Sequence, residues 1–268
     1  AARPGDAPVS RIAERFAHLA GRKAFVPYIT AGDPSLDVTR QLAHMLEAEG
    51  ADVLELGVPF TDPIADGPVN QRASQRALDA GVTPGDVLDL VATLRSEGFA
   101  LPIVLFTYSN PLLRILADGG YARLQGVDGV LVTDLPPEEA VEHIAAARAA
   151  GLDTVFLAAP TTPEARMAGI AAASSGFLYY VSSKGVTGAR SALPEDLEGQ
   201  VAAIKQHTDL PVCVGFGIST RESAARVCDV ADGYVIGSAL VRTVEQAVTE
   251  GRDPVEALRA FVVAVDPR

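Results

Sequence analysis

Three carboxylates lie close together at the end of one short apolar segment. Glu55 sits inside the apolar run 53–56, and Asp62 and Asp66 follow it in a proline-rich loop that contains no basic residue. Carboxylates held near each other in apolar surroundings have pKa values that can be pushed apart, so one site can supply both an acid and a base. Taken alone, the segment is equally compatible with an acidic surface loop.

A second group of residues has the composition of a phosphate site. Glycine-rich turns occur at 185–188, 215–219 and 237–238, each shortly after an apolar run. Such turns expose backbone N–H groups, and the last of them opens a helical pattern whose first turn favours an anion. Thr187 and Ser238 add hydroxyl donors. The alternative is that these glycines serve only tight turns.

The elements that must position these residues follow a repeating pattern of short apolar runs and longer amphipathic stretches. The apolar runs are continuous rather than alternating, which is typical of strands buried on both faces. Helical patterns separate them, and alternation of strand and helix favours a parallel sheet. The predicted strands are 24–29, 53–56, 103–107, 129–132, 154–157, 178–181, 212–214 and 233–236, and the helices include 35–49, 84–97, 138–150, 163–173, 194–205 and 221–230.

Eight strand–helix units without a break in composition predict a single α/β domain over residues 1–268, a (β/α)8 TIM barrel. A doubly wound open sheet is the alternative, but no Gly-x-Gly-x-x-Gly follows the first strand. An extra N-terminal helix, capped by Ser10 and apolar at Ile12, Phe16 and Leu19, is expected to cover the bottom of the barrel. The long loop 182–193 after the sixth strand is expected to be a mobile lid, with a plain surface loop as the alternative.

Composition excludes several classes of function. The formal net charge is −12 with only 22 Lys and Arg, which disfavours nucleic acid as a partner. No apolar run approaches the length of a membrane span, and no stretch resembles a signal peptide, so a cytoplasmic location is expected. Cys213 and Cys228 give no disulfide framework. The four histidines show no metal-ligand spacing, so no metal is expected.

In a barrel of this kind the active site lies at the carboxyl ends of the strands. Glu55 would stand there among apolar neighbours, which favours its protonated form and the role of general acid. Asp66, on the following loop, would stay ionised and bind or deprotonate a donor N–H. Acid–base chemistry on a phosphorylated substrate is therefore predicted, with isomerisation, decarboxylation and aldol-type cleavage all left open.

Several of these segments carry a family resemblance. The run 54–68, Leu-Glu-Leu-Gly-Val-Pro-Phe-Thr-Asp-Pro-Ile-Ala-Asp-Gly-Pro, and the Gly-Val-Thr-Gly at 185–188 are highly specific in combination. Together with 25–34, 108–111, 179–188, 215–218 and 237–238, they show that the sequence resembles the alpha subunits of tryptophan synthase over nearly its whole length.

The resemblance implies a lyase that splits indole-3-glycerol phosphate into indole and glyceraldehyde 3-phosphate by a retro-aldol reaction. Glu55 would protonate the indole ring and then take a proton from the glycerol hydroxyl. Asp66 would bind the indole N–H and stabilise the charge that develops there. Tyr179 matches a tyrosine beside the catalytic glutamate, and Thr187 matches the threonine of the lid.

The resemblance also implies a partner, a beta subunit that carries pyridoxal phosphate and receives the indole within an α2β2 complex; this chain itself needs no cofactor. It assigns the remaining positions by group: the phosphate cradle is Gly188, Gly217, Gly237 and Ser238; the indole pocket is Tyr28, Phe106 and Phe216; the partner contact is Asp62, Asn110 and Asp134. Asn70 stands where the family usually has an aliphatic residue, and this departure is expected to affect helix packing but neither the acid nor the base.

Two other functions are weighed against the lyase. A phosphosugar isomerase or epimerase would share the barrel, the phosphate turns and the carboxylates, but it leaves the aromatic residues around Tyr28, Phe60 and Phe106 without a purpose. A barrel that only binds and activates a partner would have no use for the pair of Glu55 and Asp66.

Overall fold

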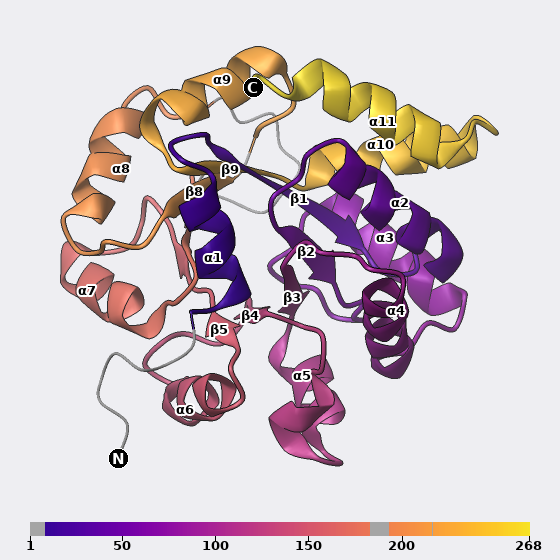
Figure 1. The fold of residues 1–268 in the computed structure, drawn as a ribbon, viewed down its shortest axis with the longest axis horizontal. Coiled ribbons are helices and arrows are strands. Elements are labelled where there is room, and N and C mark those ends of the chain that lie inside the picture. Colours follow the sequence, from indigo (N-terminus) through magenta and orange to yellow (C-terminus); the bar gives the residue numbers. More distant parts are fainter. Residues whose placement is uncertain (1–8, 183–192, 216) are drawn as a thin grey trace.

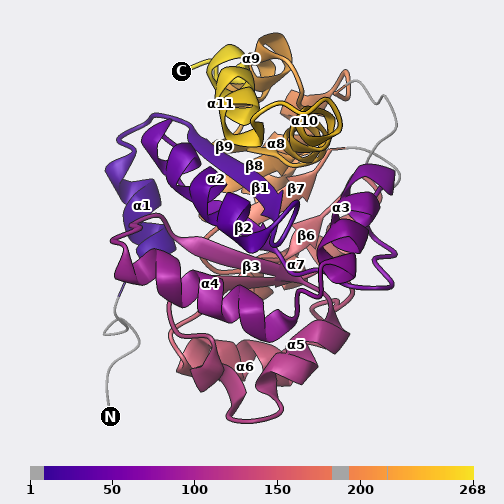
Figure 2. The same cartoon turned by 90° about the vertical axis from the view of Figure 1, so that its right-hand side faces the viewer.

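The strands form one parallel sheet that is wrapped by helices (Figures 1 and 2). The computed structural model describes residues 9–182, 193–215 and 217–268. The strands are β1 (Ala24–Thr30), β2 (Leu54–Gly57), β3 (Ile103–Thr107), β4 (Gly129–Val132), β5 (Asp153–Thr154), β6 (Leu157–Ala158), β7 (Leu178–Val181), β8 (Val212–Gly215) and β9 (Gly233–Ile236). The helices are α1 (Arg11–His18), α2 (Leu36–Ala48), α3 (Pro68–Asp79), α4 (Pro84–Ser96), α5 (Ser109–Leu116), α6 (Val141–Ala149), α7 (Glu164–Ala173), α8 (Leu197–Lys205), α9 (Arg221–Val230), α10 (Ser238–Thr249) and α11 (Pro254–Val265), with a 3-10 turn at Gly120–Arg123.

The sheet closes on itself through the chain between β5 and β6. The strand order is β5-β4-β3-β2-β1-β9-β8-β7-β6, so its two ends are consecutive pieces of one segment. Within that segment the Val155 N–H donates to the Val130 carbonyl at 3.0 Å, and the Phe156 carbonyl accepts from the Tyr179 N–H at 3.2 Å. The predicted TIM barrel is confirmed. The single fifth strand expected at 154–157 is wrong in detail, because its two halves pair with different neighbours and form two short strands.

Side chains alternate between the barrel interior and the surrounding helices. Leu54 and Leu56 of β2 pack outward in the large cluster that includes the helices, whereas Val53 belongs to the interior cluster. Because both faces of each strand are covered, apolar residues are required at nearly every strand position, which explains the continuous apolar runs. The other strand and loop residues of the interior cluster are Ala24, Val26, Val104, Leu131, Val155, Phe177, Tyr179, Cys213 and Val235.

Helix α1 closes the amino-terminal end of the barrel, as the sequence predicts (Figure 1). The Ser10 side chain caps it by accepting a hydrogen bond from the Ala13 N–H at 3.1 Å. Ile12 is 0% exposed and packs in the interior cluster, and the Phe16 ring lies 5.9 Å from that of Phe177. The apolar face of this short helix thus replaces solvent at the bottom of the barrel.

A charge cluster around Asp52 joins several parts of the chain at the same end. Asp52 is fully buried and accepts hydrogen bonds from Arg15 at 2.7 Å, Arg22 at 2.6 Å and Arg268 at 2.7 Å. The Phe25 N–H donates to it as well, at 2.8 Å. A buried carboxylate is costly unless it is paired and hydrogen-bonded, and here these donors from α1, its following turn, β1 and the last residue satisfy it.

A second charge cluster joins α3 to α10. Arg76 of α3 donates to both carboxylate oxygens of Asp33, at 2.7 and 2.8 Å, and also to Glu245 of α10 at 2.7 Å. Arg72, one turn earlier, donates to both oxygens of Glu245 at 2.7 Å. Paired N–H donors of this kind fix the geometry as well as the charge, so the two helices are held in register.

The role of α1 can be tested by shortening its buried side chain. Ile12→Ala removes apolar contacts inside the barrel and leaves a cavity, so we expect a loss of about 2–5 kcal/mol in the free energy of unfolding measured with urea. Val9→Ala, at a side chain that is 64% exposed, is the matched control and should change it by less than about 0.5 kcal/mol. Equal effects of the two substitutions would contradict the packing described for α1.

Candidate active site

Glu55 points into the barrel at the carboxyl end of β2. It lies two residues after the inward-facing Val53, and it is in register with Tyr28 of β1 and Val104 of β3. The residue is 1% exposed, and neither carboxylate oxygen has a hydrogen-bond partner among the residues that the structure describes. Burial disfavours the charged form and raises the pKa of Glu55 to about 8. The carboxyl group therefore carries a proton at neutral pH and is available as a general acid.

Two buried tyrosines pack beside Glu55 over glycines. A Cβ on Gly57 would lie 2.3 Å from the Tyr28 hydroxyl, and a Cβ on Gly215 would lie 2.2 Å from the Tyr179 hydroxyl. Side chains at these positions would collide with the phenols, so the glycines allow the tyrosines to lie along the inner wall. The Tyr28 hydroxyl is also within 3.3 Å of the hydroxyl of Thr30.

The same tyrosines show that the two proposed carboxylates share one site. Burial raises the pKa of Tyr179, and the charges of Glu55 and Asp66 raise it further. Burial followed by the charge of Asp66 raises the pKa of Tyr28, with a smaller contribution from Glu55. Both carboxylates thus act on both phenols, which stay protonated at neutral pH. The structure thus brings Glu55, Asp66, Tyr179 and Tyr28 together, and their catalytic and binding roles stay predictions.

Asp66 is held by two side chains from different elements. It is 6% exposed, and its Oδ2 accepts a hydrogen bond from the Tyr108 hydroxyl at 2.7 Å, while its Oδ1 accepts one from the Asn70 amide at 3.2 Å. Burial raises the pKa of Asp66, and these two hydrogen bonds oppose the rise. The Ala65 N–H in turn donates to the Tyr108 hydroxyl at 3.1 Å, which fixes the phenol.

Sequence reasoning missed both partners of Asp66. The expectation that Asn70 leaves the acid and the base untouched is wrong, because its amide binds the Asp66 carboxylate directly. The signal was present: Asn70 follows Asp66 by four residues at the start of a helix, where such side chains meet. Tyr108 follows β3, the strand next to β2, so its place at the same end of the barrel was foreseeable although its bond was not.

Aromatic rings line the barrel mouth beside Glu55. The Tyr28 and Phe106 rings meet edge to face with centroids 5.1 Å apart, and Phe60 lies 5.3 Å from Tyr108. Tyr28 and Phe106 lie on β1 and β3, on either side of β2, and Phe60 and Tyr108 lie on the loops that follow β2 and β3. The rings can therefore form the wall of a pocket for a flat apolar group. Phe216, also predicted for this pocket, lies outside the described residues.

The described part of the predicted phosphate cradle lies after two adjacent strands, β8 and β9. Gly217 has φ = +73°, a conformation that favours glycine. Gly237 precedes α10 without supplying a side-chain cap, and Ser238 is the first residue of that helix. The arrangement is suited to an anion at a helix N-terminus. Thr187, Gly188 and nearly all of the predicted lid 182–193 lie outside the described residues.

The three residues predicted for a partner contact are exposed at the carboxyl end of the barrel. Asp134 accepts hydrogen bonds from the Ser109 N–H at 2.7 Å and from its hydroxyl at 2.9 Å, which ties the loop after β4 to the start of α5. Asp62 accepts one from the Thr61 hydroxyl at 2.6 Å, and Asn110 lies on α5. Their roles in binding a partner stay predictions.

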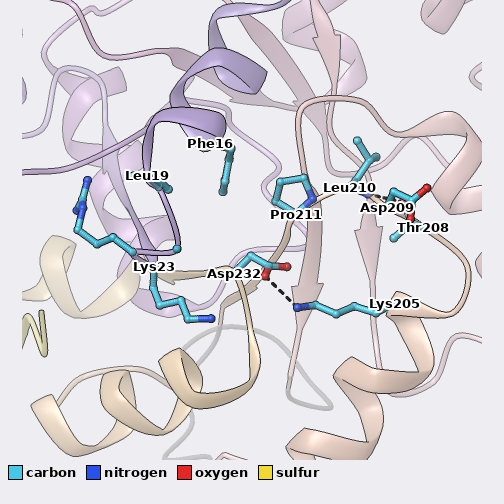
Figure 3. Close-up of a pocket in the computed structure, with 11 residues that line it drawn as sticks. Phe16, Leu19, Lys23, Lys205, Thr208, Asp209, Leu210, Pro211 and Asp232 are labelled. Carbon is cyan, nitrogen blue, oxygen red and sulfur yellow. Dashed lines mark hydrogen bonds and ion pairs between the residues drawn. The ribbon is translucent and has the colours of Figure 1, made fainter.

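A cavity of about 490 Å³ lies at the opposite end of the barrel (Figure 3). Phe16 and Leu19 of the α1 region and Pro211 before β8 line it, and Lys205 and Asp232 at its edge pair with each other at 2.9 Å. It is remote from Glu55, because these residues precede the strands. Among the described residues, no group of three or more His, Cys, Asp or Glu side chains could hold a metal ion, and no helix is long and apolar enough to cross a membrane.

Comparison with known proteins decides the family. The family model described as tryptophan synthase alpha chain matches residues 16–266. The chain belongs to the tryptophan synthase alpha chain family. The tryptophan synthase alpha chain of Laribacter hongkongensis is 51% identical over 258 residues, which are 95% of this chain and 98% of that protein.

Solved structures of this family share the fold. The tryptophan synthase alpha subunit of Legionella pneumophila superposes with a TM-score of 0.88 at 38% identity, covering 96% of this chain and 97% of that one. A chain of the tryptophan synthase a2b2 complex of the hyperthermophile Pyrococcus furiosus, studied for the mutual activation of its subunits, superposes with a TM-score of 0.81 at 40% identity, covering 90% of this chain and 97% of that one.

The raised pKa of Glu55 predicts how stability depends on pH. In the unfolded chain Glu55 loses its proton near 4.5, but in the folded barrel it does so near 8, so rising pH between these values destabilises the fold. Glu55→Gln removes this dependence. We expect the free energy of unfolding of the variant to rise relative to that of the parent across this window, by on the order of 5 kcal/mol at most.

The measurement is urea unfolding of both proteins at several pH values from 4 to 9. Glu198→Gln, at an exposed glutamate on α8, is the matched control and should run parallel to the parent at every pH. Parallel curves for Glu55→Gln would mean that Glu55 ionises alike in the folded and the unfolded chain.

Proposed function

We propose that this chain cleaves indole-3-glycerol phosphate into indole and glyceraldehyde 3-phosphate by a retro-aldol reaction in which Glu55 is the general acid and base. Cleavage of this substrate is the activity of the tryptophan synthase alpha family. The observation that carries the residue assignment is the pair of buried carboxyl groups, one without a hydrogen-bond partner among the described residues and one held by two donors.

The environments of the two carboxyl groups suit different steps. The protonated Glu55 donates its proton to the indole ring carbon that bears the side chain, which makes the ring cationic. The resulting carboxylate then takes the proton of the adjacent glycerol hydroxyl, the carbon–carbon bond breaks, and its electrons return to the ring while the aldehyde forms. A pKa near neutrality suits a group that must both give and take a proton in one turnover.

Asp66 has the complementary role. Its hydrogen bonds from Tyr108 and Asn70 favour the ionised form, and one carboxylate can accept further donors at its remaining lone pairs. As an ionised acceptor it would bind the indole N–H and stabilise the positive charge that develops on the ring. Tyr179 of β7 would face Glu55 of β2 within the barrel interior, where the charge of Glu55 raises the pKa of the phenol, and it would keep the carboxyl group in place.

The remaining residues would hold the two ends of the substrate. We assign the flat ring to the wall formed by Tyr28 and Phe106, with Phe216 completing it. We assign the phosphate to the turns after β8 and β9, where Gly217, Gly237 and Ser238 offer backbone and hydroxyl donors. Gly188 and the lid residue Thr187 belong to the same proposal.

The partner of this chain is the tryptophan synthase beta subunit, as in the a2b2 complex of the family. We propose that the exposed residues Asp62, Asn110 and Asp134 contact it, that indole passes to it directly, and that pyridoxal phosphate is carried there and not on this chain. We further propose that residues 1–268 act as one domain and that the complex works in the cytoplasm.

Substitution of Glu55 tests the catalytic assignment. Glu55→Gln keeps the size of the side chain but can neither give nor take the proton, so we expect indole release from indole-3-glycerol phosphate to fall by about 100- to 10,000-fold with the beta subunit present. Binding of glycerol phosphate should be retained, because it depends on the turns after β8 and β9. The same Glu198→Gln control should be fully active, and substantial turnover by Glu55→Gln would refute the role of Glu55.

A further inference from the structure

Asn70 lies where it can govern the acid–base state of Asp66. It is the third residue of α3, it is 5% exposed, and its Nδ2 donates to the Asp66 Oδ1 at 3.2 Å. The other oxygen of Asp66 is taken by the Tyr108 hydroxyl at 2.7 Å. The carboxylate is therefore held from two sides, by one donor from the end of β3 and one from α3, and its plane is fixed.

The hydrogen bond to Asp66 orients the Asn70 amide, but this orientation leaves the other atom of the amide without a partner among the described residues. Its Oδ1 is buried and has no hydrogen-bond partner among the described residues. A buried polar atom without a partner destabilises a fold, so a purely structural residue at this position would be apolar. In the opposite orientation, the amide oxygen Oδ1 would face the oxygen of Asp66. Neither oxygen can donate a hydrogen bond when Asp66 is ionised, so the two would repel each other. The observed orientation thus serves Asp66 rather than α3.

We propose that Asn70 is a positioning residue for Asp66, a second donor that keeps this carboxylate ionised and correctly directed during cleavage. The proposal rests on the role given to Asp66 above. A donor to the charged form opposes the effect of burial, and without it Asp66 would hold a proton at a higher pH. An aliphatic side chain at this place could not donate such a hydrogen bond.

The other titratable side chains that face Asp66 all have pKa values raised by burial. Tyr108 from the end of β3, Tyr28 from β1 and Tyr179 from β7 are phenols whose pKa values are all raised by burial. Glu55 of β2, which acts on two of these phenols, has its pKa raised to about 8. The substrate's phosphate and the beta subunit are common to the parent and the variant, so a shift of the acid limb between the two is assigned to Asp66, the group that Asn70 contacts.

The test is the pH dependence of kcat/KM for indole release by Asn70→Leu in the complex with the beta subunit. Loss of one hydrogen bond to a charged group should move the acid limb to higher pH by about one unit. At pH values below that limb, kcat/KM of the variant should then be about tenfold lower than that of the parent. The midpoint temperature of thermal unfolding should stay the same or rise, because the substitution removes the buried, unpaired Oδ1 of Asn70. Asn70→Ala serves as a second variant if the leucine is not accommodated.

Ser74→Ala is the matched control, since Ser74 is a buried polar residue one turn further along the same helix. Its acid limb should coincide with that of the parent. A merely structural Asn70 would lower the thermal midpoint and leave the acid limb of Asn70→Leu in place, which would overturn the proposal.

Asp66→Asn separates this inference from the proposed function. If Asp66→Asn cleaves the substrate normally, the role given to Asp66 is wrong and the inference falls with it. If Asp66→Asn is inactive but the acid limb of Asn70→Leu does not move, only the inference about Asn70 is wrong. Carbon NMR of the Asp66 carboxyl in the parent and in Asn70→Leu gives the same answer without activity, because the pKa of Asp66 should rise in the variant.

Discussion

A closed ring of parallel strands forces every second side chain into one narrow interior, and the chemistry of this chain depends on that constraint. Val53 directly precedes β2 and Glu55 lies two residues later within it, so the alternation that buries the valine also buries the carboxyl group. The proton of Glu55 is then retained because the ionised form is poorly solvated, and no side chain in the described part of the chain holds it by a hydrogen bond. Burial also raises the pKa of Asp66, on the loop after β2, but two donors reach its carboxyl group and oppose that rise.

The barrel could be predicted from sequence because strands covered on both faces are apolar without interruption. The same property hid the break in the fifth strand. Residues 154–157 form one apolar run, and nothing in it shows that Thr154 pairs with β4 whereas Leu157 pairs with β7. Strand pairing depends on backbone directions at the point of closure, and side-chain hydrophobicity carries no information about them.

The carboxyl groups of the site could be predicted from the sequence, whereas their hydrogen-bond donors could not. Burial of Glu55 and its raised pKa follow from its place at the end of an apolar run, and the pairing with Asp66 follows from their spacing. The donors to Asp66 did not follow, because Tyr108 is 42 residues away in sequence and Asn70 looked like a packing substitution. Hydrogen-bond geometry within a loop is set by side-chain rotamers, which a residue pattern does not specify. Family resemblance was misleading at Asn70, since it assigned no role to an unusual residue.

The charge cluster between α3 and α10 has a consequence for substrate binding. Helix α10 begins at Ser238 in the proposed phosphate turn, and α3 begins directly after the loop that carries Asp66. Arg72 and Arg76 of α3 both pair with Glu245 of α10, and these ion pairs join the two helices. Binding of the substrate's phosphate at the start of α10 can therefore help to align Asp66, which binds the other end of the substrate. In this way the phosphate, which does not react, helps to set the geometry of the carbon–carbon bond that breaks.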